Sequence, residues 1–457
     1  MTKVCFCGIS GNGMSPLAQI LSLKGYDVYG SDRSFDAGRD DKNRQALLDM
    51  GIKLVPQDGS GITKDMETVY ISAALDENNP DIKTALSLNI PIKKRSDLLC
   101  ETFEQYPLGI AIGGTSGKTT TTAMVGYILD MLGKKPCLIN GGMLRNYEKL
   151  KGLPNFIFNQ DKICVIEADE SDGSICKYHP NIALINNISH DHTSMENLIK
   201  YFTTFAGNTK DVLVVNYDCP LTMNLTHTTK TITFSTLSNK ADFYAQNIKC
   251  LPGGVQYDFR DKTFKLNLFG AFNVANALAA IAVCAQAGVD PFEAAKTLEG
   301  FIGVKRRLEI VGKTKNNITL IDDFAHNPSK IASALAALKE YPNRIMVMYQ
   351  SHSPFSAKNT GGEIAEEAAK TLRKDDIFLM PEVYMLDKSV DKDITANNII
   401  CAIKAHGHEN AFFLDTQANV YDFILKNAKP DDHIVIMGAR DNSLPDFSRR
   451  LLKDLDK

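Results

Sequence analysis

Residues 110–122 have the sequence IAIGGTSGKTTTT, and this stretch decides how the middle of the chain folds. The apolar run over residues 108–112 is typical of a buried parallel strand. The glycines at 113, 114 and 117 permit a tight turn that directs backbone N–H groups toward an anion. Residues 123–130 can continue as a helix, so its positive N-terminus would face that anion. The pattern therefore predicts a strand, a phosphate-binding loop and a helix.

This loop is one glycine short of the common phosphate-loop pattern, because Ile112 stands five residues before Gly117. Lys118 offers a positive charge to the outer phosphates of a nucleotide, and Thr119 offers a hydroxyl to a magnesium ion. A glycine-rich turn without a ligand is the alternative, but the strand, Gly-Lys-Thr and the helix follow in order. We expect a nucleoside triphosphate to contact Gly114, Thr115, Ser116, Gly117, Lys118, Thr119 and Thr120.

Composition limits the class of protein. The 457 residues are enough for about three domains at roughly 150 residues each, and 44% of them are apolar. The net charge of −3 gives no general affinity for nucleic acid or a membrane surface. The ten cysteines lack metal-binding spacing, and no leader or membrane-spanning segment is evident. We expect a cytoplasmic protein with reduced thiols and with neither nucleic-acid nor membrane partners.

The first hundred residues predict a nucleotide-binding α/β unit. An apolar strand at 3–7, the turn GISGNGM at 8–14, a helix at 15–23 and a strand at 26–30 lead to Ser31 and Asp32. The turn has G-x-x-G-x-G spacing, so a dinucleotide redox site and a ligand-free fold of the same kind remain alternatives. A further strand at 69–74 ends where ligands of such sheets usually bind.

The second unit carries an acidic segment. A buried strand at 162–166 leads into EADESD, residues 167–172, and four acids in six residues would repel one another unless a cation is bound. A strand at 182–188 leads into SHDH, residues 189–192. Glu167, Thr119 and His192 together suit a magnesium site, although a solvated acidic loop is the alternative. A helix that starts near residue 268 places Asn273 and Asn276 on one face.

The third unit opens with a basic cluster, GVKRRLE at 303–309. A strand at 318–321 ends at DDFAHNP (322–328), and a helix follows from 329. A strand at 345–349 ends at 350–354, and further strands cover 376–380 and 433–437. Polar residues follow strand after strand, as they do at the functional edge of an open parallel sheet.

The order of these motifs resembles the Mur ligases, the ATP-dependent amide-forming enzymes of peptidoglycan precursor synthesis. The matching stretches are GISGNGMS with GSD, GGTSGKTTTT, EADESDGS, HPNIALINNI with DH, FNVANALAAIA, GVKRRLE and DDFAHNP. The resemblance covers nearly the whole chain. It implies an α/β fold of three domains: a Rossmann-like domain for a UDP-linked substrate (1–103), a central phosphate-loop ATPase domain with a mostly parallel sheet (104–303), and a Rossmann-like domain for an amino acid (304–457).

The resemblance also implies the reaction and its residues. ATP and Mg²⁺ would activate the carboxylate of UDP-N-acetylmuramate as an acyl phosphate for an amino acid, with L-alanine the first expectation, in a monomer or homodimer. The implied catalytic residues are Lys118, His192, Arg307 and His326. The UDP-substrate would contact Gly11, Asn12, Gly13, Met14, Ser31, Asp32 and Ser72. ATP would also contact Asn273, Asn276, Arg307 and Asp323, and the metals would contact Thr119, Glu167 and His192. The amino acid would contact His326, His352 and Arg440.

Arg307 and Lys118 lie in different implied domains, so we expect the active site to be completed by domain closure. Several positions depart from the family pattern. Phe272 replaces a histidine, and DDFAHNP replaces DDYAHHP. The alanine-adding members carry PHRYSRT where this chain has SHSPFSA at 351–357, so two arginines are missing and Arg440 is a possible replacement. The alternatives therefore include a ligase that adds a tripeptide, one with another acid or amino acid, and a nucleotide-binding regulator without catalysis.

Overall fold

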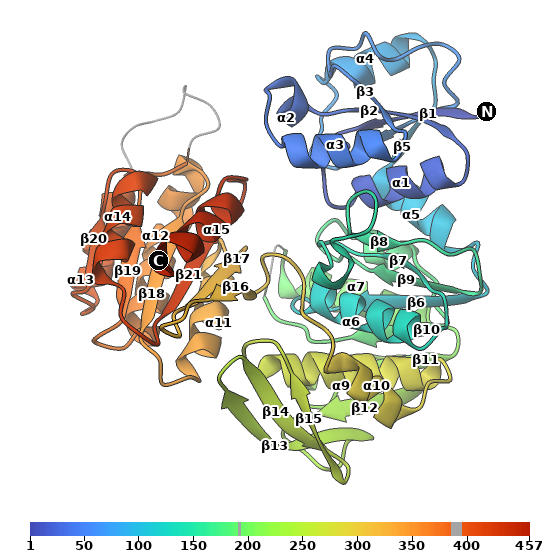
Figure 1. Ribbon diagram of the computed structural model, residues 1–457. Coiled ribbons are helices and arrows are strands. Elements are labelled where there is room, and N and C mark those ends of the chain that lie inside the picture. The colour runs from blue at the N-terminus through green and yellow to red at the C-terminus, as the bar shows by residue number, and fades with distance from the viewer. Residues whose placement is uncertain (191–192, 385–394) are drawn as a thin grey trace. The chain divides into compact units, whose positions relative to one another are not determined.

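The computed structural model describes residues 1–190, 193–384 and 395–457. Its α/β fold contains three sheets, which confirms the expected fold class (Figure 1). The chain forms two compact units. One contains residues 1–247, 257–266 and 274–304, and the other contains 248–256, 267–273 and 305–457.

The N-terminal sheet has five parallel strands in the order β3-β2-β1-β4-β5. The chain adds β2 and β3 on one side of β1 and then adds β4 and β5 on its other side. The carboxyl ends of β1 and β4 therefore form the switch point, where such sheets bind ligands. The strands are β1 (Lys3–Cys7), β2 (Asp27–Ser31), β3 (Lys53–Val55), β4 (Thr68–Ile71) and β5 (Ile92–Lys94), and the helices are α1 (Ser15–Leu23), α2 (Arg33–Asp36), α3 (Asp41–Asp49), α4 (Pro80–Ser87) and α5 (Arg95–Phe103).

Alternating residues of β1 explain why helices cover both faces of this sheet. Val4 and Phe6 belong to a buried cluster with side chains of α1, α3 and α5, whereas Cys5 and Cys7 belong to a second cluster with Ala85 of α4. Such two-sided burial is expected of a parallel sheet. The larger cluster continues into the central sheet, which is why both sheets belong to one compact unit.

The central sheet has ten strands in the order β15-β14-β13-β12-β11-β10-β6-β9-β7-β8. The strands from β13 to β7 in this order run parallel, and β8 is antiparallel to β7. The strands are β6 (Leu108–Gly113), β7 (Cys137–Ile139), β8 (Phe156–Ile157), β9 (Ile163–Glu167), β10 (Ile182–Ile185), β11 (Val212–Asn216), β12 (Lys230–Ser235), β13 (Phe243–Leu251), β14 (Gly254–Phe259) and β15 (Lys262–Leu266). The helices are α6 (Lys118–Met131), α7 (Met195–Gly207), α8 (Pro220–Met223), α9 (Phe272–Gln286) and α10 (Pro291–Leu298), with the short 3₁₀ turns η1 (Arg145–Tyr147) and η2 (Ser174–Lys177).

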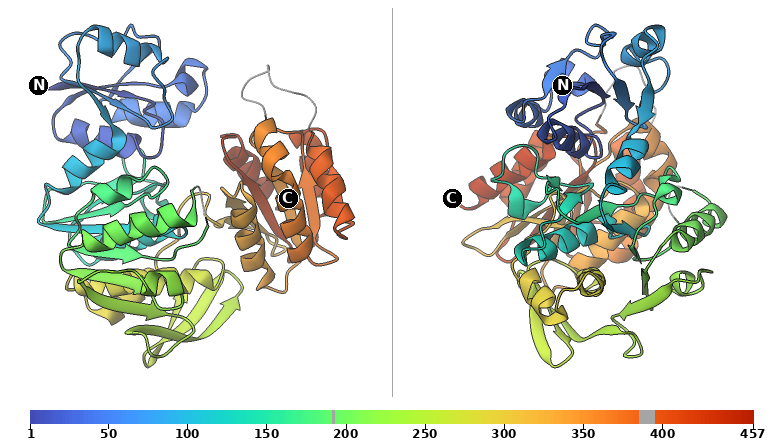
Figure 2. Two further views of the ribbon diagram at one scale, coloured as in Figure 1. Left: turned by 180° about the vertical axis from the view of Figure 1, so that it is seen from behind. Right: turned by 90° about the vertical axis from the view of Figure 1, so that its right-hand side faces the viewer.

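The C-terminal sheet has six strands in the order β16-β17-β21-β18-β19-β20, and only β16 is antiparallel to its neighbour. One face packs against α11, α12 and α13 and the other against α14 and α15, so the sheet lies between helices (Figure 2). The strands are β16 (Glu309–Lys313), β17 (Thr319–Asp323), β18 (Ile345–Gln350), β19 (Ile377–Met380), β20 (Ala411–Phe413) and β21 (His433–Gly438), and the helices are α11 (Pro328–Lys339), α12 (Pro354–Thr371), α13 (Ala396–Ala405), α14 (Gln417–Asn427) and α15 (Leu444–Leu455).

The strand, loop and helix expected at 108–130 are confirmed as β6, the loop and α6. Three expected elements differ from the observed ones by three residues or more at one end. The strand expected at 69–74 stops at Ile71, and the one expected at 182–188 stops at Ile185, because the asparagines that follow turn toward the phosphate loop. The helix expected from residue 268 begins at Phe272, since Gly270 has a left-handed backbone with φ of 88° that a helix cannot include.

Candidate active site

The phosphate loop joins β6 to α6 at the middle of the central sheet (Figure 1). Gly117 has φ of 82°, a left-handed conformation that favours glycine. A Cβ atom at this position would lie 2.5 Å from Asn276 Oδ1 and 2.7 Å from Asn186 Nδ2. Glycine is therefore required here both for the backbone turn and for the close approach of two buried amides.

Lys118 lies over this loop and is held by two acceptors. Its Nζ donates to the Gly114 carbonyl oxygen at 2.7 Å and to Glu170 Oε1 at 2.9 Å, and Glu170 Oε2 is 2.8 Å away. The Glu170 side chain is only 1% exposed, and burial raises the pKa of its carboxyl although Lys118 opposes the shift. The positive charge that phosphates would use is thus paired with a buried carboxylate.

Thr119 and Glu167 form the expected oxygen pair. Because β9 lies beside β6, Glu167 at the end of β9 reaches the first turn of α6, and Thr119 Oγ1 donates to Glu167 Oε1 at 2.9 Å. Gly141 N donates to Glu167 Oε2 at 2.9 Å and orients the carboxylate. A carboxylate and a hydroxyl at this spacing fit a magnesium ion that also binds phosphate oxygens. His192, the third expected ligand, lies outside the described residues.

Among the residues that the structure describes, no three His, Cys, Asp or Glu side chains form a metal-binding group.

The outer side of the loop is tied to the segment that follows β10. Asn187 Oδ1 accepts from Ser116 N at 2.9 Å and from Thr115 Oγ1 at 2.8 Å. Gly114 has φ of 129° and packs against the backbone of the same segment, and Thr120 lies half-buried in the first turn of α6. These bonds fix the loop before any ligand binds, which reduces the ordering that binding would require.

The two asparagines of α9 have different surroundings. Asn276 lies beside the phosphate loop, where its Oδ1 accepts from Asn186 Nδ2 at 3.4 Å. Asn273 Nδ2 donates to the Phe269 carbonyl oxygen at 2.7 Å, four residues earlier in the chain. The structure therefore brings Asn276 to the loop and gives Asn273 a local contact at the start of the helix.

The glycine turn of the N-terminal sheet follows β1. Ser10 N and Oγ donate to Asp32 Oδ2 at 3.0 and 2.6 Å, so Asp32 connects the end of β2 to this turn. Ser31 is fully buried and donates to Asp81. The carbonyl oxygen of Asn12 accepts from Asn155 Nδ2 at 3.3 Å, which ties the turn to the central sheet.

The remaining expected residues of the N-terminal site surround this turn. Gly11 accepts at its carbonyl oxygen from Met14 N at 2.9 Å, and Met14 is buried. Ser72 follows β4, with its Cβ 3.2 Å from the position that a Cβ on Gly8 would take. Gly13 faces Arg95. The turn and the end of β4 therefore meet at the switch point of the sheet.

The basic cluster at residues 303–309 contains two arginines with different surroundings. Arg306 donates to Asp322 Oδ1 at 3.2 Å and to the Gly438 carbonyl oxygen at 2.5 Å, so it holds β17 and β21 together. Arg307 is exposed, with its guanidinium 5.7 Å from the centre of the Phe324 ring. Asp323 accepts from the backbone N–H groups of Leu308 and Ala325 at 2.7 Å each and thereby positions the segment that carries Arg307.

The carboxyl ends of β17, β18 and β21 bring together three expected side chains. The rings of His326 and His352 are 5.4 Å apart in an edge-to-face arrangement, and Arg440 is near enough for its charge to act on His352. The Phe324 carbonyl oxygen lies 2.9 Å from His326 Nδ1, so the neutral ring keeps Nε2 as an acceptor. Burial lowers the pKa of His326 to about 4, and burial with the Arg440 charge lowers the pKa of His352.

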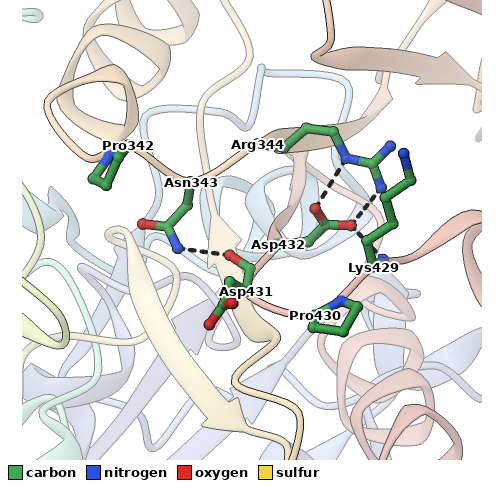
Figure 3. Close-up of a pocket in the computed structure, with 7 residues that line it drawn as sticks. All are labelled: Pro342, Asn343, Arg344, Lys429, Pro430, Asp431 and Asp432. Carbon is green, nitrogen blue, oxygen red and sulfur yellow. Dashed lines mark hydrogen bonds and ion pairs between the residues drawn. The ribbon is translucent and has the colours of Figure 1, made fainter.

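A cavity of about 450 Å³ lies at the opposite edge of the same sheet, at the start of β18 and β21 (Figure 3). Arg344 donates to both oxygens of Asp432 at 2.9 and 2.6 Å, and Asn343 donates to the Asp431 carbonyl oxygen at 2.6 Å. These groups satisfy one another, and none of the expected site residues lines this cavity.

Three family models match the chain along most of its length. They are the Mur ligase family catalytic domain over residues 3–107, the Mur ligase middle domain over 112–284, and the Mur ligase glutamate ligase domain over 306–440. A UDP-N-acetylmuramate–L-alanine ligase of Desulforamulus reducens is 31% identical, with 100% of this chain and 98% of the relative covered.

The chain belongs to the Mur ligase family. This Mur ligase is also 33% identical to the UDP-N-acetylmuramate–L-alanine ligase of Caldicellulosiruptor bescii, with 96% of each chain covered. The solved structure of the UDP-N-acetylmuramate–alanine ligase of Thermotoga maritima has a TM-score of 0.82 at 28% identity and covers 99% of both chains. The recognition made from the motif order is thereby confirmed. Within the described part of this Mur ligase, no helix has the length and apolar character needed to span a membrane.

Sequence reasoning missed several residues that complete the site. Glu170 was one of four acids in its segment, and no local pattern distinguished it as the partner of Lys118. Asn186 and Asn187 are at the end of an expected strand. A pair of amides beside a phosphate loop could have been predicted as part of the site. Gly141 gave no signal, since its role depends on the close approach of Glu167, whose Oε2 would lie 2.4 Å from a Cβ there.

Proposed function

We propose that this Mur ligase joins L-alanine to the lactyl carboxylate of UDP-N-acetylmuramate at the expense of ATP, in peptidoglycan precursor synthesis. Two relatives named UDP-N-acetylmuramate–L-alanine ligase support this proposal, because they align with 100% and 96% of the chain. We further propose three functional domains: residues 1–103 for the UDP-substrate, 104–303 for ATP and 304–457 for the amino acid.

The observation that carries this proposal is the arrangement of Lys118, Thr119 and Glu167 around one loop. A phosphate-binding turn, a lysine, and a hydroxyl bonded to a carboxylate at 2.9 Å are the groups that phosphoryl transfer from a nucleotide requires. Their joint presence argues against a regulator that has lost catalysis. Thr119 and Glu167 would hold Mg²⁺, which would neutralise phosphate charge when bound.

In the first step, an oxygen of the lactyl carboxylate attacks the γ-phosphorus of ATP, the bond to the β–γ bridging oxygen breaks, and ADP leaves. A carboxylate is a poor electrophile, so this step supplies a phosphate leaving group. Lys118 exchanges its bond with Glu170 for the phosphate oxygens, and the backbone N–H groups from Gly114 to Gly117 orient them. Asn276, His192 and Arg307 complete the expected contacts of ATP, its metals and the transferred phosphoryl group.

In the second step, the amine of the amino acid attacks the acyl carbon, and the tetrahedral intermediate collapses with loss of phosphate. His326 Nε2 would accept a hydrogen bond from that amine; the contact of Nδ1 with the Phe324 carbonyl oxygen supports this role, because it leaves Nε2 as the acceptor. Arg440 supplies a positive charge beside His352 for the amino-acid carboxylate. We propose that substrate-dependent closure brings Arg307 to the γ-phosphate; unchanged scattering profiles with both substrates would contradict this closure.

A phosphate-release assay tests the proposal with ATP, magnesium and UDP-N-acetylmuramate against each single amino acid and the tripeptide. We expect release with L-alanine, and about a 10²- to 10³-fold lower rate for Lys118→Ala. Lys134→Ala, an exposed lysine just beyond α6, is the matched control and should keep the full rate. Absence of release with every acceptor would refute UDP-N-acetylmuramate as the substrate, whereas release with the tripeptide alone would redirect the assignment to tripeptide addition.

A further inference from the structure

The N-terminal site, as expected from the sequence, contains no positive charge. Its turn offers neutral backbone N–H groups, and its one ionisable side chain is Asp32, a carboxylate. A nucleoside diphosphate ester carries two negative charges, which proteins usually bind with arginine or lysine. A cation from elsewhere in the chain would therefore strengthen diphosphate binding at this turn.

Arg95 provides such a cation from the far side of β4. It is the first residue of α5 and follows β5, so it emerges from the same edge of the sheet as the turn after β1. Its side chain lies across the glycine turn: a Cβ built on Gly13 would be 2.8 Å from Arg95 Cδ and 3.2 Å from Nη1. The arginine side chain therefore occupies the space beside Gly13, and a side chain at position 13 would have to displace it.

The guanidinium of Arg95 is available to an anion that approaches more closely than Asp172 does. Its ion pair with Asp172 is long, at 3.9 Å between Nη2 and Oδ2, and both side chains keep some exposure, 20% and 35%. Arg344, which lines the cavity in Figure 3, is different, since it makes short bonds to both oxygens of a buried carboxylate. Among the described residues, the Arg95–Asp172 ion pair is thus longer than either bond of Arg344 to Asp432.

Asp172 belongs to the acidic segment that also pairs with Lys118 and carries Glu167. Glu170 Oε2 of this segment lies 2.8 Å from Lys118 Nζ, and Asp172 Oδ2 lies 3.9 Å from Arg95 Nη2. The acidic segment thus lies between two cations, one at each nucleotide site.

We infer that Arg95 binds the diphosphate of the UDP-linked substrate above the glycine turn, and that Asp172 competes with the diphosphate for this arginine. The inference rests on the proposed function for the identity of the nucleotide. Arg95 acts as a positioning residue, because it fixes the diphosphate at the end of the substrate remote from the reacting carboxylate.

Calorimetric titration with UDP, and separately with uridine, tests this assignment on the full-length protein. We expect Arg95→Ala to weaken UDP binding by about 10- to 100-fold, as for loss of charge-assisted hydrogen bonds, and to leave uridine binding unchanged. Arg95→Lys should recover part of the affinity, since lysine keeps the charge without the fork. Asp172→Asn should tighten UDP binding by a few-fold, which a purely structural role for Arg95 would not produce.

Lys94→Ala is the matched control, because Lys94 is the exposed neighbour of Arg95 and should leave UDP affinity unchanged. In steady-state assays, Arg95→Ala should raise the KM for UDP-N-acetylmuramate and leave that for ATP unchanged. Wild-type affinity of Arg95→Ala for UDP, or an equal loss for UDP and uridine, would overturn the inference. If the wild type turns over and Arg95→Ala binds UDP as the wild type does, this inference fails and the proposed ligase function stands. If UDP binding depends on Arg95 but the wild type shows no turnover, only the ligase assignment fails.

Discussion

Replacement of Lys118 by alanine should destabilise this Mur ligase as well as inactivate it. In the wild type, Glu170 is 1% exposed and has the lysine ammonium 2.8 and 2.9 Å from its two oxygens. Lys118→Ala leaves this buried carboxylate without its cation. Removal of one partner of a buried ion pair is costly because the remaining charge is uncompensated.

The size of the effect is limited by protonation. A stranded Glu170 can bind a proton, and at pH 7 this costs about 3.7 kcal/mol for a carboxyl with an ordinary pKa of about 4.3, at about 1.36 kcal/mol per pH unit. At pH 5 the same limit is about 1 kcal/mol. Lys118 is 14% exposed, so water screens the pair in part. We therefore expect a loss of about 2–3.5 kcal/mol in the free energy of unfolding at pH 7.

The sign of the pH dependence follows from the raised pKa of Glu170. A carboxyl whose pKa is higher in the folded state stabilises the fold at acid pH, and that contribution is lost as the pH rises through the folded-state pKa. Loss of Lys118 raises this pKa further. The stability difference between wild type and Lys118→Ala should therefore grow between pH 5 and pH 7.

Urea unfolding at pH 5, 6 and 7 measures this stability difference. The proteins compared are the wild type, Lys118→Ala, Glu170→Gln and the double variant Lys118→Ala/Glu170→Gln. The double variant should regain most of the stability at pH 7, because a neutral amide replaces the stranded charge, but its phosphate release should remain as slow as that of Lys118→Ala. An equal penalty for Lys118→Ala at pH 5 and pH 7, or a double variant as unstable as the single one, would refute this explanation.

Three further changes test other parts of the structure. Thr119→Val removes the hydroxyl that donates to Glu167 and should raise the magnesium concentration for half-maximal phosphate release about tenfold or more; an unchanged magnesium dependence would contradict a metal at this pair. Gly117→Ala adds a Cβ where φ is 82° and should cost about 2–4 kcal/mol of stability and raise the KM for ATP, as measured by urea unfolding and initial rates. Burial raises the pKa of Asp322 to about 7 even with Arg306 beside it, so its contribution to stability falls between pH 4 and pH 7, and Asp322→Asn should flatten the stability profile over this range.

Local patterns were sufficient for the elements of the site that are contiguous in the chain. The strand, the glycine loop and the helix at 108–131 could be predicted because the strand pattern, the turn glycines and the Lys-Thr pair act within one short segment. The acidic segment after β9 was expected at the metal for the same reason, since polar residues at a strand end meet their neighbours at one edge of a parallel sheet.

The sequence by itself therefore determined the α/β class, the phosphate loop and the family, because these depend on residue order and spacing. Tertiary structure decided which of several equivalent residues has which role. Glu170, rather than another acid of 167–172, contacts Lys118, and Arg95 reaches Gly13 only because β5 lies one strand beyond β4. Arg306 and Arg307 carry the same charge at adjacent positions, yet one is bonded to a buried aspartate and the other is exposed. Long-range packing sets these differences, and local sequence patterns do not encode that packing.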